Sequence, residues 1–125
     1  MKRIVYTDRA PSPVGPYSQA VKAGDFLFIS GQIALESQSG KLVTEDIEKE
    51  THLVMKNLQS VLKAANMDFD NVVKCSIFVR DINQYALINE VYSEYFRGSQ
   101  PPARELVEVT RLPKDANVEI SAIAI

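Results

Sequence analysis

The stretch Pro101-Pro102-Ala103-Arg104-Glu105-Leu106-Val107-Glu108-Val109 joins a stiff approach to an apolar, strand-like run. Two consecutive prolines cannot donate ladder hydrogen bonds, so a strand can begin only after them, at Ala103. Arg104 is therefore presented at the mouth of a strand, where its planar fork of donors suits the carboxylate of a small ligand. An ordinary surface ion pair with Glu105 or Glu108 would account for the same arginine. The segment alone leaves both interpretations open.

Outward from this stretch, the order of strands and helices predicts an α+β fold. Turn and strand signals predict strands at residues 3–7, 19–22, 26–32, 72–79, 103–109 and 118–125, with a hairpin turn at 23–25. Two apolar stripes of helical period lie between them. Thr44 is placed to cap the first helix and Asn66 to end it, while Asp81 or Asn83 would cap the second and Gly98 end it. We expect one mixed β-sheet with two helices packed on one face.

The predicted strands are apolar on both faces. In residues 26–32, strict alternation places Phe26, Phe28 and Ser30 on one face and Leu27, Ile29 and Gly31 on the other. Two helices can cover only one face, so something else must bury the second, most economically copies of the same chain. We therefore expect an oligomer with clefts in which loop residues from two chains meet.

Composition predicts a single globular domain spanning residues 1–125 and narrows its partners. The net charge is -2 and the basic residues are scattered, which disfavours nucleic acid because phosphate backbones are bound by clustered Lys and Arg. Apolar runs are too short to span a bilayer, so we expect a cytoplasmic protein with no membrane partner. A single cysteine, Cys75, excludes an internal disulfide, and with a single histidine, His52, leaves too few soft ligands for a zinc site.

Few residues are left that could carry chemistry. Cys75 lies in an apolar strand and reads as a core thiol, His52 as a solvated helix residue, and Tyr92 and Tyr95 as core aromatics. Glu119 lies in the apolar last strand. It is either a solvent-facing carboxylate or a buried one, whose raised pKa would suit a general base or acid. The other candidates are Arg104, Tyr17 on a proline-stiffened loop, Ser30 with Gly31, and Asn89; Ser30 and Asn89 would equally be ordinary surface residues.

A series of short motifs runs along nearly the whole chain: Ala10-Pro11, Gly15-Pro16-Tyr17-Ser18-Gln19, Ser30-Gly31-Gln32, Asn57-Leu58, Val72-Val73-Lys74, Phe78-Val79, Asn89 with Tyr92, Pro102-Ala103-Arg104, Arg111-Leu112-Pro113-Lys114-Asp115, Glu119-Ile120 and Ala122-Ile123-Ala124. In this order and spacing they resemble the reactive intermediate deaminase family, RidA or YjgF/YER057c/UK114. The resemblance implies a chorismate-mutase-like fold assembled as a homotrimer, in which three sheets form a barrel with clefts between subunits. It also implies that no cofactor is needed.

The resemblance further implies hydrolysis of reactive enamines and imines, such as 2-aminoacrylate, 2-iminopropanoate and 2-iminobutanoate, to 2-oxo acids and ammonia. Arg104 would bind the substrate carboxylate and Glu119 would activate water. Tyr17, Ser30 and Gly31 would shape the cleft, and Asn89 would support Glu119 or the cleft wall. A non-catalytic module that binds small carboxylates is the alternative, and a ribonuclease or translation inhibitor is disfavoured by the charge pattern.

The chain departs from the family pattern directly after Arg104. Many members have a small hydroxyl residue and then cysteine where this chain has Glu105 and Leu106. A carboxylate next to Arg104 would compete for the guanidinium, and Leu106 would change the shape of the cleft if it pointed inward.

Overall fold

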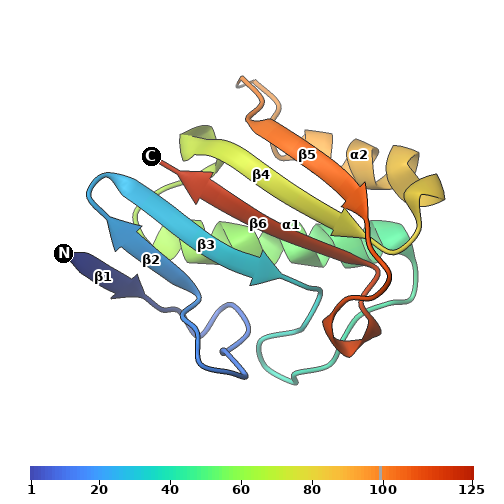
Figure 1. Cartoon of the computed structure of the whole chain (residues 1–125), viewed down its shortest axis with the longest axis horizontal. Helices are drawn as coiled ribbons and strands as arrows, with labels where there is room; N and C mark the ends of the chain where they lie inside the picture. Colours follow the sequence, from blue (N-terminus) through green and yellow to red (C-terminus); the bar gives the residue numbers. More distant parts are fainter. Residues whose placement is uncertain (99) are drawn as a thin grey trace.

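The computed structural model describes residues 1–98 and 100–125 and shows a mixed sheet with two helices on one face (Figure 1). The sheet order is β1 (Lys2–Val5), β2 (Ala20–Ala23), β3 (Phe26–Gln32), β6 (Val118–Ala124), β4 (Val72–Val79) and β5 (Ala103–Glu108). Neighbouring strands are antiparallel except β4 and β5, which are parallel because α2 (Tyr85–Glu94) lies between them in the chain. The α+β prediction is confirmed.

Most element boundaries follow from local sequence signals. Strand β4 covers the predicted residues 72–79, and the predicted hairpin joins β2 to β3 through Gly24, whose φ of +59° suits glycine. Helix α1 (Ile47–Ala64) ends before Asn66, which adopts the expected left-handed conformation with φ of +59°. Helix α2 ends at Glu94, earlier than the predicted stop at Gly98.

The predicted cap of α1 at Thr44 is wrong. Asp46 is the N-cap, and its carboxylate accepts a hydrogen bond of 2.8 Å from the backbone N–H of Lys49. The apolar stripe begins at Ile47, which is buried, so the first turn must start there and the residue just before it becomes the cap. For the second helix, Asp81 caps a short 3-10 turn, Ile82–Gln84, that leads into α2.

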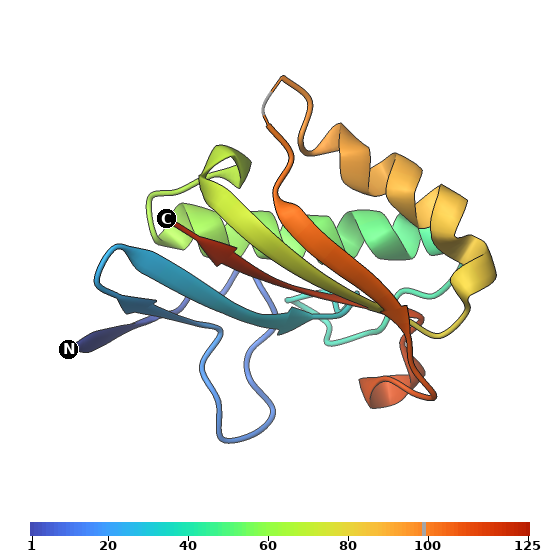
Figure 2. The same ribbon diagram turned by 45° about the horizontal axis from the view of Figure 1, so that its top comes forward.

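The helices cover one face of the sheet and leave the other exposed. Figure 2 shows α1 and α2 together on one side, where Leu58 and Leu62 of α1 belong to the same buried core as Ile77 and Ile120 of the sheet. None of the helices in residues 1–98 and 100–125 covers the other face, and Phe26 and Phe28 on β3 remain 43% and 45% exposed there. The uncovered apolar face is thus as predicted, whereas the oligomer that would bury it stays a prediction.

A β-bulge interrupts the pairing of β3 with β6. Ile29 pairs with Ala122 but Gln32 pairs with Ile120, so β3 uses one more residue than β6 across the same span. Gly31 is thereby turned to the uncovered face, where it lies against Glu119. The prediction that Gly31 shares a face with Leu27 and Ile29 is wrong, because strict alternation does not survive a bulge.

No helix in the described residues, 1–98 and 100–125, is long and apolar enough to cross a membrane.

Candidate active site in two halves

The first half of the site is built around Glu119 in the middle of the uncovered face. Strand β6 alternates, so Val118 and Ile120 are fully buried under the helices while Glu119 projects to the opposite side and is half-buried. Burial raises the pKa of the Glu119 carboxyl above its ordinary value of 4.5, since desolvation disfavours the charged form. A carboxylate with a raised pKa is better suited to accept a proton and return it than an ordinary surface carboxylate.

Gly31 makes room for this carboxylate. A Cβ atom at Gly31 would lie 2.5 Å from Oε2 of Glu119 and 2.8 Å from its Cδ, far inside van der Waals contact. The bulge and the missing side chain therefore act together, because the bulge brings Gly31 to this face and the glycine lets the carboxyl lie against the backbone. The structure thus brings Gly31 and Glu119 side by side, a contact that the sequence did not predict.

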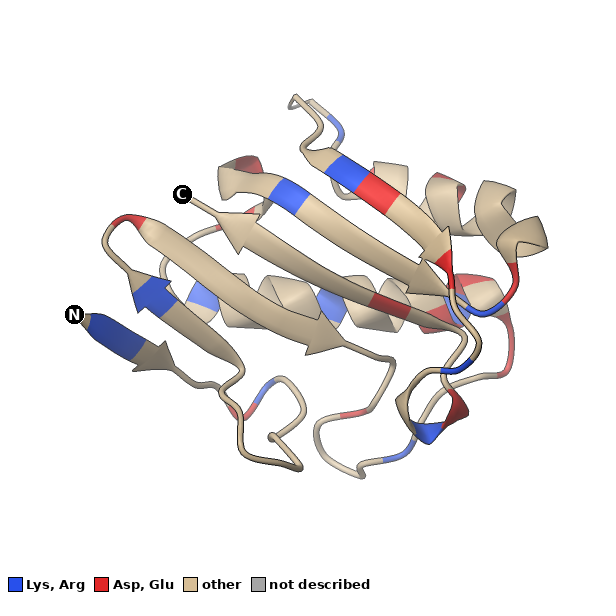
Figure 3. Ribbon diagram, in the orientation of Figure 1, with Lys and Arg blue, Asp and Glu red and all other residues tan. Residues whose placement is uncertain are grey.

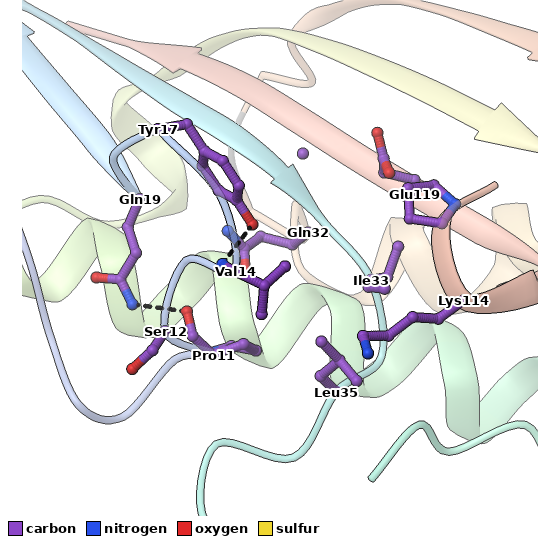
Figure 4. A pocket seen from close by; sticks show the side chains of 12 residues that line it. Pro11, Ser12, Val14, Tyr17, Gln19, Gln32, Ile33, Leu35, Lys114 and Glu119 are labelled. Carbon is purple, nitrogen blue, oxygen red and sulfur yellow. Dashed lines mark hydrogen bonds between the residues drawn. The ribbon is translucent and has the colours of Figure 1, made fainter. Parts of the chain in front are cut away.

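A pocket of about 150 Å³ opens beside Glu119 (Figure 4). Its walls are the proline-rich loop with Val14 and Tyr17, the end of β3, and the turn at Pro113 and Lys114. Tyr17 is half exposed, and its hydroxyl accepts a 3.5 Å hydrogen bond from the backbone N–H of Val14. The proline-rich loop thus places Tyr17 at the Glu119 pocket.

Ser30 has a structural place next to this pocket. Its hydroxyl donates to the carbonyl of Ser18 at 2.6 Å, and its backbone N–H donates to the carbonyl of Gln19 at 2.9 Å. Gln19 is itself 2% exposed, and its amide nitrogen donates to the carbonyls of Thr7, Ala10 and Pro11. Ser30 and Gln19 therefore fasten the loop that carries Tyr17. Sequence reasoning missed this role of Gln19, for which the only signal was a polar residue within a proline-rich motif.

The second half of the site is built around Arg104 at the start of the edge strand β5. Its guanidinium carbon lies 4.8 Å from the ring centroid of Tyr92 and 5.8 Å from that of Tyr85. One terminal nitrogen donates a 3.2 Å hydrogen bond to the Tyr85 hydroxyl. A hollow of about 330 Å³ beside the guanidinium is lined by Asn89, Tyr92 and Pro102 among others.

Arg104 has no acidic partner among the described residues. Glu105 accepts hydrogen bonds from the hydroxyl of Ser76 and from Lys74, the latter at 3.1 Å. Both bonds lower the pKa of the Glu105 carboxyl, and the bond from Ser76 has the larger effect. Glu108 accepts from the backbone N–H of Ile82 at 2.9 Å. Successive side chains of a strand point to opposite faces, so Glu105 turns away from Arg104 while Leu106 packs on the same side, at the edge of the core. The surface ion pair considered from sequence is therefore wrong for both glutamates.

The two halves lie on opposite faces of the sheet within one chain. Arg104 is opposite Cys75 of β4 on the helix side, whereas Glu119 is opposite Phe78 of β4 and faces away from the helices. Asn89 accompanies Arg104, while Tyr17 and Gly31 accompany Glu119. A single chain does not bring the arginine and the carboxylate to one ligand, and Asn89 does not lie at Glu119.

The remaining candidates are as the sequence indicated, with one addition. Cys75 is 1% exposed, and burial raises the pKa of its thiol. His52 is partly exposed and shares a 2.8 Å hydrogen bond with the Tyr95 hydroxyl. Tyr92 is buried as predicted, but its contact with Arg104 was missed. The signal was its spacing of seven residues from Tyr85, which places both tyrosines on one face of α2.

A mixed sheet with helices on one face, an arginine without an acidic partner in the part of the chain that the structure describes, and a half-buried carboxylate define a small α+β protein. The chain belongs to the YjgF/RidA family: the family's sequence model, described as endoribonuclease L-PSP, matches residues 7–125.

Individual relatives resemble the chain over almost its whole length. A RutC family protein of Pyrococcus horikoshii is 49% identical over 99% of this chain and 98% of its own. The 2-iminobutanoate/2-iminopropanoate deaminase of Homo sapiens is 43% identical over 100% of this chain and 90% of its own. Among solved structures, a conserved Rid-family protein from Yersinia pestis superposes with a TM-score of 0.97 at 46% identity, covering 99% of this chain and 98% of that one. The fold is therefore the Rid/YjgF fold.

Proposed function

We propose that this protein hydrolyses reactive 2-imino acids and their enamine tautomers to 2-oxo acids and ammonia, in the cytoplasm. The substrate class comprises 2-aminoacrylate, 2-iminopropanoate and 2-iminobutanoate. The observation that carries the proposal is the Arg104 guanidinium, held beside a hollow with no acidic partner among the described residues. Human and mouse relatives, each 43% identical, are named for this deaminase activity, which supports the same assignment.

The active cleft would form between copies of the chain. Because Arg104 and Glu119 face opposite sides of the sheet, a cleft would combine Arg104 and Asn89 of one copy with Glu119, Gly31 and Tyr17 of the next. We propose a homotrimer in which three sheets form a barrel and bury the apolar face that the helices leave open. This arrangement also gives the exposed Phe26 and Phe28 a partner.

The proposed chemistry needs only groups that one cleft would contain. Arg104 binds the substrate carboxylate by two charge-assisted hydrogen bonds, which leaves the imine carbon C2 facing Glu119. Glu119 takes a proton from water as the water oxygen bonds to C2, and the electron pair of the C=N bond moves to nitrogen. Glu119 returns this proton to the nitrogen, which gives the carbinolamine. Glu119 then transfers the carbinolamine hydroxyl proton to the nitrogen as the C–N bond breaks, so that ammonia leaves and C2 becomes the ketone of the 2-oxo acid. An enamine substrate first takes a proton on carbon to become the imine.

A coupled assay tests this proposal. A pyridoxal-phosphate dehydratase generates the imine, and the rate of 2-oxo acid formation is followed with and without the protein. Each hydrogen bond to a charged partner contributes about 1.5 to 3 kcal/mol, so Arg104→Ala should lower kcat/KM at least about 10²-fold. Arg3→Ala, an exposed arginine on β1, is the matched control and should keep full activity. Full activity in Arg104→Ala would refute the proposal.

Two other functions give different results in the same experiments. A non-catalytic carboxylate-binding module would bind 2-oxobutanoate but leave the rate of imine decay unchanged. A ribonuclease, which the family description names, would cleave RNA in a way that a site substitution abolishes. The charges disfavour it, because Lys and Arg are spread over strands, helices and loops among Asp and Glu (Figure 3).

A further inference from the structure

The environment of the Arg104 guanidinium contains two tyrosines and no acid among residues 1–98 and 100–125. The ring face of Tyr92 lies 4.8 Å from the guanidinium carbon, and Tyr85 adds both a ring at 5.8 Å and a hydroxyl acceptor at 3.2 Å. A guanidinium over an aromatic face is attracted by the ring quadrupole, and this attraction does not consume its hydrogen-bond donors. The arginine is thus held largely without using the donors that a ligand needs.

The Tyr92 ring is a rigid support because packing fixes it from behind. Tyr92 is 5% exposed and packs against Phe96, with ring centroids 4.8 Å apart, and Phe96 in turn packs against Phe69 at 5.4 Å. The strand partner of Arg104 is Cys75, which is also buried. An aromatic ring packed in this way cannot move aside when the guanidinium moves, so the guanidinium position is defined by the core itself.

The Tyr92 hydroxyl is not the group that holds the arginine. It is buried, and although the Cys75 thiol and Arg104 lie within polar contact of it, neither forms a hydrogen bond of good geometry with it. Burial raises the pKa of this phenol further above its ordinary value, so it stays neutral. A buried hydroxyl without a partner stabilises nothing by itself, and the useful part of Tyr92 is therefore its ring.

We propose that Tyr92 and Tyr85 are positioning residues that form a two-tyrosine cradle for Arg104. The cradle holds the guanidinium at the hollow lined by Asn89 and Pro102 before any ligand arrives. A preorganised arginine loses less side-chain freedom when a carboxylate binds, so the cradle strengthens ground-state binding of 2-imino and 2-oxo acids. The inference rests on the proposed role of Arg104 as the carboxylate-binding residue.

Calorimetry with 2-oxobutanoate on the full chain tests the cradle. Tyr92→Leu removes the ring and should weaken Kd about 3- to 30-fold, the range expected for a desolvated cation–π contact. Tyr92→Phe keeps the ring and should leave Kd within about 2-fold of wild type, with unchanged or higher thermal stability because it removes only an unpartnered hydroxyl. In the coupled assay the loss in Tyr92→Leu should appear in KM more than in kcat.

Tyr95→Leu is the matched control, at the C-cap that directly follows the same helix. Tyr95 packs against Phe69 and His52 and does not contact Arg104, so its loss disturbs aromatic packing but should leave Kd unchanged. Equal losses of affinity in Tyr92→Leu and Tyr95→Leu would overturn the cradle, since general loosening of α2 would then explain both. A loss in Tyr92→Phe as large as in Tyr92→Leu would overturn it too, because the hydroxyl would be the acting group.

A second measurement needs neither ligand nor turnover. An aromatic face this close shifts the Arg104 Nε–H and δ-methylene proton resonances, so Tyr92→Leu should move them in the free protein while Tyr92→Phe should not. Tyr85→Phe, an exposed position that does not threaten folding, should speed exchange of the terminal guanidinium protons. Unchanged Arg104 resonances in both Tyr92→Leu and Tyr85→Phe would refute the cradle. Altered resonances in a protein that binds no 2-oxo acid would instead refute the proposed function and leave the cradle standing.

Discussion

Replacement of Gly31 by alanine should move the Glu119 carboxyl without changing the stability of the fold. The new methyl group would lie 2.5 Å from Oε2, 2.8 Å from Cδ and 3.1 Å from Cγ of Glu119. Contacts this short are not tolerated, and the movable partner is the end of a flexible side chain. We expect the carboxyl to swing away from the backbone while the strands keep their places.

The magnitude of the effect follows from the geometry. A displacement of about 1 Å at a reacting group can cost about 10²-fold in rate, so kcat/KM for imine hydrolysis should fall by about that factor. Stability should change little, since Gly31 does not have a positive φ and alanine at a compatible strand position costs no backbone strain. The expected signature is lost activity with an unfolding midpoint close to that of wild type.

Gly24→Ala is the matched control because it produces the opposite result. Gly24 lies in the β2–β3 turn with φ of +59° and no atom within 4 Å of an added Cβ. Alanine there would make no clash, but its left-handed backbone conformation would be strained. The cost is about 1 to 2 kcal/mol of unfolding free energy, with activity retained. The coupled assay measures activity and urea denaturation measures stability, both on all three proteins. A fully active Gly31→Ala variant would refute the claim that Glu119 acts from its place against Gly31.

Four further predictions concern Glu119 in activity and in stability, Glu50, and the uncovered face. Because burial raises the Glu119 pKa, kcat/KM should fall on acidification with an apparent pKa above 4.5. Glu119→Gln should lose the activity, and its remaining activity should not show this fall at acidic pH. The same group stabilises the fold fully below pH 4.5 and less as pH rises through its raised folded-state pKa, which a urea titration of wild type against Glu119→Gln measures. Glu50 is 0% exposed and accepts from the Asn117 backbone N–H at 2.7 Å and its side-chain amide at 2.8 Å. Glu50→Ala should therefore lower the unfolding free energy by roughly 2 to 4 kcal/mol, and Glu50→Gln by less. By light scattering, wild type should have three times the 14.0-kDa chain mass and Phe28→Asp the mass of one chain, and a monomeric wild type would contradict the proposed trimer.

Local signals in the sequence were sufficient for the elements of the fold. The hairpin, the bounds of β4 and the left-handed Asn66 follow from residues that are neighbours in the chain. Propensity, alternation and turn chemistry act over a few residues, so they can be read without knowing what packs on them. The α1 cap was misplaced by two residues, from Thr44 to Asp46, because several residues there can cap and the buried position of Ile47 decides among them.

The sequence also contained the residues of the candidate site but not their arrangement. Alternation along β5 and β6 predicts which side chains of one strand share a face. The pairing between strands decides which residues of different strands lie on the same face of the sheet. Only the tertiary structure placed Arg104 with the tyrosines of α2 and Glu119 on the far side of the sheet. The bulge that turns Gly31 toward Glu119 arises from the β3–β6 pairing, between strands about 90 residues apart in the chain, as the paired residues Ile29 and Ala122 show.

The stretch from Pro101 to Val109 illustrates the division. Its prolines and alternating side chains determined by themselves that a strand starts at Ala103 and presents Arg104, and β5 begins there. Whether Glu105 forms an ion pair with Arg104 depends on residues outside this stretch that can bind Glu105 instead. Lys74 and Ser76 of the neighbouring strand bind Glu105 on the opposite face, so Arg104 has no acidic partner among residues 1–98 and 100–125. Charges on one strand are set by the sequence, but their partners are set by the register between strands.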